Sequence, residues 1–232
     1  MQKISIYPSV LAIKEDPTSW DSRISSLGIT VSGIHYDIGD GEFVPSMMLP
    51  VENLDYLSKS REQKAESKGE DFYLPQNELP IDVHLMVRKP SMYFSTILDF
   101  EKVAAVAFHI ECDEDIHETI QTLKNAGKKV GLAILDVTPV DHLDPYLLEI
   151  DYVLVMTVKG GYSGTPFISE MLEKIREIHN KNPELPILVD GGVAEQTLPL
   201  CIDAGATRAV MSSALFWGGD LGWLKNLGRW QI

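Results

Sequence analysis

The sequence contains few cysteines, few basic residues and no long apolar segment. Cys112 and Cys201 are its only cysteines, and they form no Cys-x-x-Cys pair, which argues against a disulfide framework and against a thiolate zinc site. Lysine and arginine number 20 against 34 aspartates and glutamates, so the formal net charge is −14. Nucleic-acid binding needs clustered positive charge, and a membrane span needs a longer apolar run than any in this chain. We therefore expect neither nucleic acid nor membrane as a partner.

The first residues, from Met1 to Ile6, lead directly into a strand-like run. They show neither a long apolar region nor a cleavage site of small residues, so we expect no signal peptide and a cytoplasmic location. Hydrophobic residues make up 44% of the 232 residues, which is enough for a substantial core.

Short apolar runs alternate with segments of helical periodicity along the whole chain. The predicted strands are Ile4 to Leu11, Gly33 to Ile38, Ile81 to Met86, Ala104 to Ile110, Val130 to Ile134, Tyr152 to Val158, Ile187 to Asp190 and Arg208 to Met211. The predicted helices are Ser91 to Phe100, Asp115 to Asn125, Ser169 to Asn180 and Glu195 to Ala204. Eight strands alternating with helices in a chain near ~250 residues predict a TIM (β/α)8 barrel over residues 1–232, as one domain. A doubly wound sheet would place a glycine-rich turn after its first strand, and Pro8 to Leu11 contains no glycine.

Two segments depart from this alternation. Ser58 to Asn77 is dense in charge and poor in aliphatic residues, which predicts a surface insertion between the second helix and the third strand. It could also act as a lid or an assembly contact. The tail from Leu221 to Trp230 is predicted to be a final packing helix with Trp223 and Trp230 as its buried anchors.

Four polar residues fall on predicted strands where a barrel would place its active site. His35 and Asp37 are two residues apart, so they share one face of the second strand. His84 lies late in the third strand and Asp190 closes the seventh. Each has a simpler explanation alone, since His84 could be a hydrogen-bonded core residue and Asp190 could cap a turn. Together, at strand ends of one barrel, they predict a metal or proton-transfer site.

Small residues are concentrated in the loops after the last three strands. Lys159 to Gly164 follows the sixth strand, Gly191 and Gly192 follow the seventh, and Ser212 and Ser213 follow the eighth. Glycine lets backbone N–H groups approach an anion, and the late loops of TIM barrels commonly bind phosphate. These loops predict a phosphorylated substrate.

With these motifs in order, the chain resembles the ribulose-phosphate 3-epimerase family over most of its length. The matching segments are Pro8 to Leu11, His35 to Pro45, Asp82 to Met86, Val137 to Pro139, Met156 to Gly164, Val189 to Gly192 and Ser212 to Phe216. The family is a TIM barrel that uses one divalent metal ion to invert one carbon of a ketopentose phosphate. The resemblance thus implies interconversion of D-ribulose 5-phosphate and D-xylulose 5-phosphate in the pentose phosphate pathway.

The resemblance also assigns a role to particular residues. It implies that His35, Asp37, His84 and Asp190 are the metal ligands and that Asp37 and Asp190 are also the catalytic proton-transfer pair. The implied substrate-binding residues are Ser9, His84, Met86, Met156, Gly161, Tyr162, Ser163, Gly164, Gly191, Gly192, Ser212 and Ser213. Two imidazoles and two carboxylates suit zinc, iron(II), manganese or cobalt better than calcium or magnesium. Two carboxylates on opposite faces of the planar intermediate can act as base and acid, with a metal-stabilised enediolate formed between the two proton transfers.

The chain departs from the family pattern in the wall that faces the substrate. Gly39 stands where the family has methionine, which removes bulk beside the metal. The family's Asn-Pro-Gly-Phe-Gly-Gly is here Lys159 to Gly164, its Asn-Pro after the fifth strand is Leu135-Asp136, and its Gly-Ser at the eighth strand is Ser212-Ser213. Lys159 could pair with a phosphate or face solvent.

These departures leave alternatives open. The substrate could be a related ketose phosphate such as allulose 6-phosphate, or the protein could be a sugar-phosphate sensor without turnover. A barrel decarboxylase or aldolase is a weaker rival, because decarboxylase relatives have Asp-x-Lys on the third strand where this chain has Asp82-Val83-His84. The sequence also leaves a homo-oligomer open.

Overall fold

A computed structural model describes residues 4–13, 31–45, 48–52, 54, 79–160, 165–217 and 221–226. The strands in this part of the chain are β1 (Ser5–Pro8), β2 (Ile34–Gly39), β3 (Ile81–Met86), β4 (Val103–His109), β5 (Lys129–Ile134), β6 (Tyr152–Met156), β7 (Ile187–Asp190) and β8 (Arg208–Met211). The α-helices are α4 (Ser91–Ile97), α5 (Ile116–Asn125), α6 (Met171–Lys181), α7 (Leu198–Ala204) and α8 (Ser213–Phe216). Short 3-10 helices cover η1 (Val10–Ile13), η2 (Val140–Leu143) and η3 (Gly222–Asn226).

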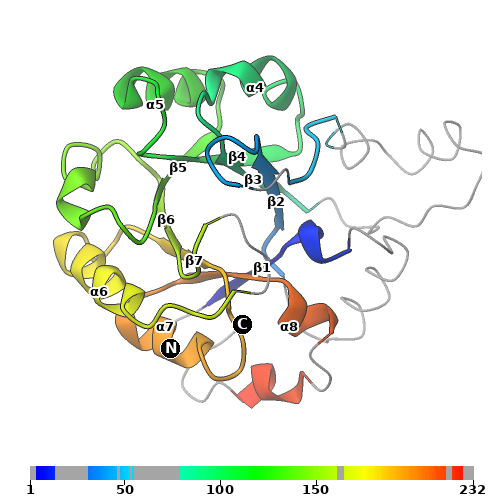
Figure 1. The fold of residues 1–232 in the computed structure, drawn as a ribbon, viewed down its shortest axis with the longest axis vertical. Helices are drawn as coiled ribbons and strands as arrows, with labels where there is room; N and C mark the ends of the chain where they lie inside the picture. Colours follow the sequence, from blue (N-terminus) through cyan, green and yellow to red (C-terminus); the bar gives the residue numbers. More distant parts are fainter. Residues whose placement is uncertain are drawn as a thin grey trace, which may run out of the picture.

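The eight strands form a nearly closed parallel barrel with helices on its outside (Figure 1). The hydrogen-bonded order is β1-β8-β7-β6-β5-β4-β3-β2, and every pairing within it is parallel. Isolated parallel bridges between Ile6 and Val31 and between Ser9 and His35 link the two ends of this order. The predicted TIM barrel is confirmed.

The strands have two apolar faces, which explains their near-continuous hydrophobic sequences. In β6, Val153 and Val155 belong to the cluster that packs the barrel against its helices. The alternating residues Tyr152, Leu154 and Met156 belong to a second cluster, which fills the barrel interior. Because successive side chains point to opposite faces, polar residues on the inner face meet inside the barrel.

Helix ends follow local hydrogen bonding more closely than apolar periodicity. Asp115 caps the start of α5, because its side chain accepts a hydrogen bond from the backbone N–H of Glu118 at 2.8 Å. The predicted helix also begins at Asp115. The predicted helix start at Glu195 was wrong, because α7 begins at Leu198. The Thr197 hydroxyl donates to the carbonyl of Gly192 at 2.7 Å and accepts from the N–H of Ala194 at 2.9 Å. This turn occupies the residues that were expected to form the first helical turn.

The first predicted strand was too long at its C-terminal end. Beyond Pro8 the N–H of Leu11 bonds to the Ser9 hydroxyl at 3.3 Å, and the N–H of Ala12 bonds to the Ser9 carbonyl at 3.3 Å. The chain therefore turns into η1 instead of continuing in the sheet.

The predicted insertion at residues 58–77 lies outside the described residues. In the tail, the described segment forms the 3-10 helix η3 and not an α-helix, and Trp223 packs partly buried against the core. Trp230 lies outside the described residues.

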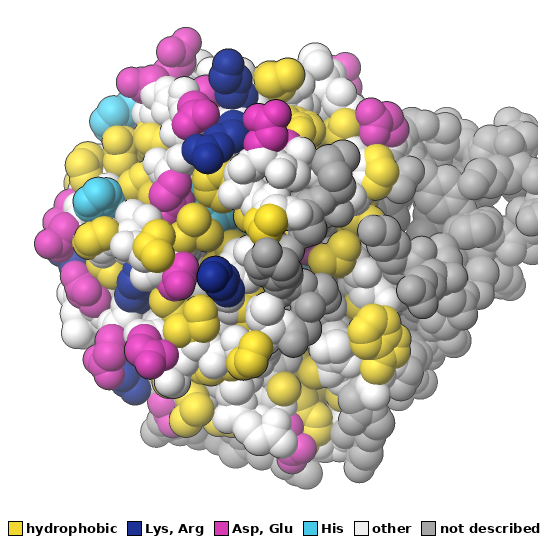
Figure 2. Space-filling view, in the orientation of Figure 1, with side chains coloured by type: hydrophobic (Ala, Val, Ile, Leu, Met, Phe, Trp, Pro, Cys, Tyr) yellow, Lys and Arg dark blue, Asp and Glu magenta, His cyan; other side chains and the backbone are white. Residues whose placement is uncertain are grey.

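Among the described helices, none is long and apolar enough to cross a membrane. The face drawn in Figure 2 shows lysines and arginines interspersed with acidic side chains.

Candidate active site and metal centre

Four polar side chains from three strands meet inside the barrel, three of them buried and Asp190 partly exposed. β2 contributes His35 and Asp37, β3 contributes His84, and Asp190 is the last residue of β7. The register pairs Asp37 with His84 across neighbouring strands, which brings these two side chains together on the inner face. One ligand atom from each residue lies within 4.8 Å of the others. The structure thus brings together all four residues that the sequence singled out for a metal.

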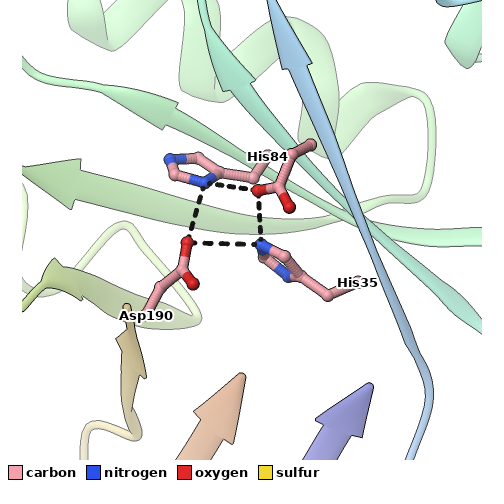
Figure 3. A group of neighbouring side chains, drawn as sticks. His35, His84 and Asp190 are labelled. Atoms are coloured by element: carbon pink, nitrogen blue, oxygen red, sulfur yellow. Dashed lines mark hydrogen bonds and ion pairs between the residues drawn. The ribbon is translucent and has the colours of Figure 1, made fainter. Parts of the chain in front are cut away.

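The four potential ligand atoms alternate between nitrogen and oxygen. Oδ1 of Asp37 lies 3.1 Å from Nε2 of His35 and 3.3 Å from Nδ1 of His84. Oδ2 of Asp190 lies 3.7 Å from the same nitrogen of His35 and 3.5 Å from the same nitrogen of His84. Figure 3 shows the side chains of His35, His84 and Asp190 turned toward one another. The arrangement offers two imidazole nitrogens and two carboxylate oxygens to a single cation.

Ser9 holds the Asp37 carboxylate in place. Its hydroxyl donates to Oδ2 of Asp37 at 2.9 Å, on the oxygen that does not face the histidines. Ser9 is 2% exposed, so this hydrogen bond is formed out of bulk water. The sequence assigned Ser9 to substrate binding, and the structure adds a contact with a catalytic candidate.

The charges of the cluster shift the pKa values of its members. Burial disfavours the imidazolium of His35, but the interactions with Asp37, Asp82 and Asp190 together outweigh this and raise the pKa of His35 well above its ordinary value. Burial likewise lowers the pKa of His84, and contacts with Asp190 and Asp37 more than reverse that effect. Burial would raise the pKa of Asp37, yet His35 and His84 hold it well below its ordinary value. The cluster therefore favours positive charge at its centre, as protons or as a bound cation.

His35 gives independent support for a cation. Both of its ring nitrogens are buried without a hydrogen-bond partner among the described residues, and so is Oδ2 of Asp82. Nε2 of His35 is at ion-pair distance from Asp37, 3.1 Å, but it makes no hydrogen bond there. A buried imidazole without a hydrogen bond is costly, and ligation through Nε2 would satisfy one nitrogen. Nδ1 of His35 lies 3.8 Å from the unpartnered oxygen of Asp82, so this carboxylate can orient the ring from behind. The residues present thus fit a divalent metal ion.

The cluster lies at the edge of a cavity of about 260 Å³. The lining residues are Ser9, Leu11, Asp37, Met48, Met86, Met156, Val158, Thr165, Asp190, Gly191, Gly192, Ser212 and Ser213. Both aspartates therefore face the cavity, whereas His35 and His84 are fully buried and are not among the lining residues. Seven of the residues assigned to substrate line this cavity, namely Ser9, Met86, Met156, Gly191, Gly192, Ser212 and Ser213. His84 does not, and Gly161, Tyr162, Ser163 and Gly164 lie outside the described residues.

The cavity wall is apolar beside the two aspartates. Met86 and Met156 line it from β3 and β6. Met48 lines it too, and its backbone N–H lies 3.4 Å from the carbonyl of Gly39. Gly39 itself has no side chain to add to this wall, and the methionine beside it comes from the following loop. Lys159 is exposed, three residues beyond the end of β6.

Two buried hydrogen-bonded groups behind the histidines were not foreseen from the sequence. Tyr152 donates to Oδ1 of Asp82 at 2.5 Å, and burial, then the Asp82 charge, raise the pKa of Tyr152 well above its ordinary value. A Cβ on Gly131 would lie 2.3 Å from Cζ of Tyr152, so only glycine leaves room for this ring. On the other side, His109 lies between His84 and Glu111.

The comparisons with known proteins agree with this geometry. The model of the "Ribulose-phosphate 3 epimerase family" matches residues 5–216. The chain belongs to the ribulose-phosphate 3-epimerase family. It is 34% identical over 194 residues to "Ribulose-phosphate 3-epimerase" of Bacillus subtilis, a match that covers 81% of each chain. It is also 34% identical over 194 residues to "Ribulose-phosphate 3-epimerase, cytoplasmic isoform" of Oryza sativa, covering 82% of this chain and 77% of the relative.

A solved structure supports the barrel fold independently of the family. A 3-hexulose-6-phosphate synthase superposes with a TM-score of 0.58 at 14% identity, covering 94% of each chain. At such low identity the similarity concerns the fold alone. Members of the epimerase family are isomerases, so the chain is placed among enzymes of that class.

Proposed function

We propose that this protein interconverts D-ribulose 5-phosphate and D-xylulose 5-phosphate, with Asp37 and Asp190 as the proton-transfer pair. The observation that supports this most is the position of the two carboxylates. They come from β2 and β7, they approach the same two imidazole nitrogens, and both line one cavity. Inverting a carbon requires one group to remove a proton from one face and another to return a proton to the opposite face. Two carboxylates from different strands of one barrel can do this.

Each aspartate has a setting suited to proton transfer. The Ser9 hydroxyl fixes Oδ2 of Asp37, and the neighbouring histidines lower the pKa of Asp37, which keeps this carboxylate ionised. Asp190 is less buried than Asp37, with 15% of its side chain exposed against 6%. Asp190 therefore has the better access to solvent protons. Asp37 and Asp190 each serve as base or as acid, depending on which epimer is bound.

We further propose that His35, Asp37, His84 and Asp190 hold one divalent metal ion. The unpartnered nitrogens of His35 and the mixed nitrogen and oxygen donors support zinc, iron(II), manganese or cobalt. Such an ion, when bound, supplies Lewis-acid stabilisation of the negative charge that develops on the substrate's oxygens. The histidines orient the two carboxylates toward the cavity, while the adjacent methionines limit water near the reacting carbon.

The small residues that line the cavity suit the phosphate group. Gly191 and Gly192 have φ angles of +108° and +63°, a region that favours glycine. A Cβ on Gly191 would lie 2.3 Å from a Cγ of Val158, so the turn requires glycine on packing grounds as well. Ser212 and Ser213, which begin α8, line the same cavity. We propose that these four residues bind phosphate together with Gly161, Tyr162, Ser163 and Gly164.

The proposed location is the cytoplasm. The rice relative is named as a cytoplasmic isoform, and the described helices include none able to cross a membrane. A ketose phosphate is the proposed partner.

A panel of ketose phosphates tests the substrate assignment. Metal-loaded protein is incubated in D2O with D-ribulose 5-phosphate or D-allulose 6-phosphate, and NMR follows deuterium at C3 and the appearance of the epimer. We expect both changes with the pentose phosphate and a much lower rate with the hexose phosphate. Faster turnover of the hexose phosphate would replace the proposed substrate. Tight binding with no exchange at C3 in either sugar would favour a sensor instead.

A further inference from the structure

His84 uses its two ring nitrogens for different purposes. Nδ1 faces the carboxylates, 3.3 Å from Oδ1 of Asp37 and 3.5 Å from Oδ2 of Asp190. Figure 3 shows the opposite edge of this ring turned away from Asp190. A neutral imidazole that offers Nδ1 to a cation must carry its proton on Nε2. Whatever contacts Nε2 can therefore decide whether His84 is able to act as a ligand.

The contact on Nε2 is a second histidine. Nε2 of His84 lies 3.0 Å from Nε2 of His109, and both rings are fully buried. The rings are stacked with centroids 5.1 Å apart, and Phe43 packs against the other side of His109 at 4.7 Å. Two imidazole nitrogens at this distance can share only one proton, so one must donate and the other accept. If His84 donates, His109 must hold its own proton on Nδ1.

Glu111 determines which ring nitrogen of His109 carries the proton. Nδ1 of His109 lies 3.2 Å from Oε2 of Glu111, and an ionised carboxylate can only accept. The second oxygen of Glu111 accepts from the backbone N–H of Leu135 at 3.0 Å, which fixes the carboxylate to the end of β5. Contacts with His109, Thr138 and Leu135 hold the Glu111 pKa below its ordinary value despite burial, so the group remains an acceptor. The proton positions are then consistent along the whole chain of hydrogen bonds. The Leu135 N–H and the Nδ1–H of His109 both donate to Glu111, and the Nε2–H of His84 donates to Nε2 of His109.

We propose that Glu111 and His109 are positioning residues that fix the tautomer in which His84 presents Nδ1 to a divalent cation. The inference rests on the metal site of the proposed function and extends it by two side chains that do not reach the cavity. Neither residue touches the candidate ligand atoms of Asp37 or Asp190, and neither lines the cavity. They act on the cation through the hydrogen bond between His109 and His84.

Glu111→Gln tests the proposed direction of these hydrogen bonds. If the amide oxygen keeps the Leu135 N–H, its NH2 group faces His109 and donates. His109 must then accept on Nδ1 and donate from Nε2, which forces the proton of His84 onto Nδ1. We expect zinc affinity, measured by competition with a chromophoric chelator, to fall by about 10–100-fold, the usual effect of removing a partner of a metal-binding histidine. The matched control is Glu173→Gln, a side chain 80% exposed on α6, for which we expect wild-type affinity.

NMR of zinc-loaded protein labelled with 15N-histidine reads the tautomers directly. In the wild type we expect the proton of His84 on Nε2 and that of His109 on Nδ1. His109→Met keeps the apolar packing but removes the acceptor, and should also weaken zinc binding. Thermal melting of the metal-free variants separates this effect from misfolding, because each variant should still unfold in one cooperative transition above the temperature of the zinc titration. The opposite tautomer of His109 in the wild type, or unchanged zinc affinity in both variants, would overturn the proposed role of Glu111 and His109. Neither result would count against the metal site itself. A wild type that binds no divalent ion would overturn both.

Discussion

Asp190→Asn is expected to lower epimerisation by roughly 10²–10⁴-fold, the usual contribution of one positioned acid or base. The amide keeps the size of the side chain but cannot accept and return a proton. Asp190 lines the cavity and its Oδ2 also faces His35 and His84, so the substitution removes the proposed proton transfer and weakens the proposed metal ligand. Asp37→Asn should have an effect of similar size. Initial rates of epimer formation by NMR or by a coupled assay give the measurement.

Metal content must be determined for each of these variants, because a lost ligand and a lost base would both slow turnover. The control is Asp141→Asn, which removes a carboxylate 74% exposed and paired with Lys181. We expect this variant to keep wild-type rates. Undiminished turnover in either Asp37→Asn or Asp190→Asn would remove the basis for the proposed function.

Chelation of the divalent ion is expected to abolish turnover and to lower the melting temperature. Metal removal leaves His35 and the two carboxylates without their proposed common partner in a site out of bulk water. An ion present at 100 times its dissociation constant adds about 2.7 kcal/mol to the free energy of unfolding, which raises the melting temperature of a domain this size by roughly 5–11 °C. Calorimetry of chelated and reconstituted protein measures the shift.

Reconstitution provides the control for chelation. Zinc, iron(II), manganese or cobalt should restore turnover, whereas the same treatment with calcium should not, because calcium prefers six to eight oxygen ligands. Full activity in protein shown by elemental analysis to hold no divalent metal would contradict the metal assignment.

The sequence was sufficient to predict the barrel and the four-residue cluster. Alternation of apolar strands and helices determined the fold, and the spacing of His35 and Asp37 placed both on one face of β2. The rule that strand ends of a parallel barrel meet at one site then brought in His84 and Asp190. None of these steps required knowledge of which strands are neighbours.

The residues behind the cluster could not be found in the same way. His109 and Glu111 have the same spacing as His35 and Asp37, so a similar signal was present in the sequence. Its meaning depends on the side-chain conformation that brings His109 within 3.0 Å of His84. Tyr152 and Asp82 are 70 residues apart and meet across the barrel only because Gly131 leaves space for the ring.

Loop positions show the same limit. Met48 lines the cavity beside Gly39 through a loop conformation that periodicity does not specify. The turn held by Thr197 shortened α7 for a similar reason, since a few side-chain hydrogen bonds displaced a regular helical turn.

Exchange of the C3 proton in D2O tests the two-carboxylate account most directly. Asp37→Asn and Asp190→Asn, each loaded with metal, are supplied separately with D-ribulose 5-phosphate and D-xylulose 5-phosphate, and NMR follows loss of the C3 proton. Each variant retains one carboxylate and therefore one face from which a proton can be removed. If the two carboxylates act on opposite faces of C3, each variant exchanges the proton of only one epimer, and the two variants act on opposite epimers. Exchange of the same epimer at the same rate in both variants would contradict it.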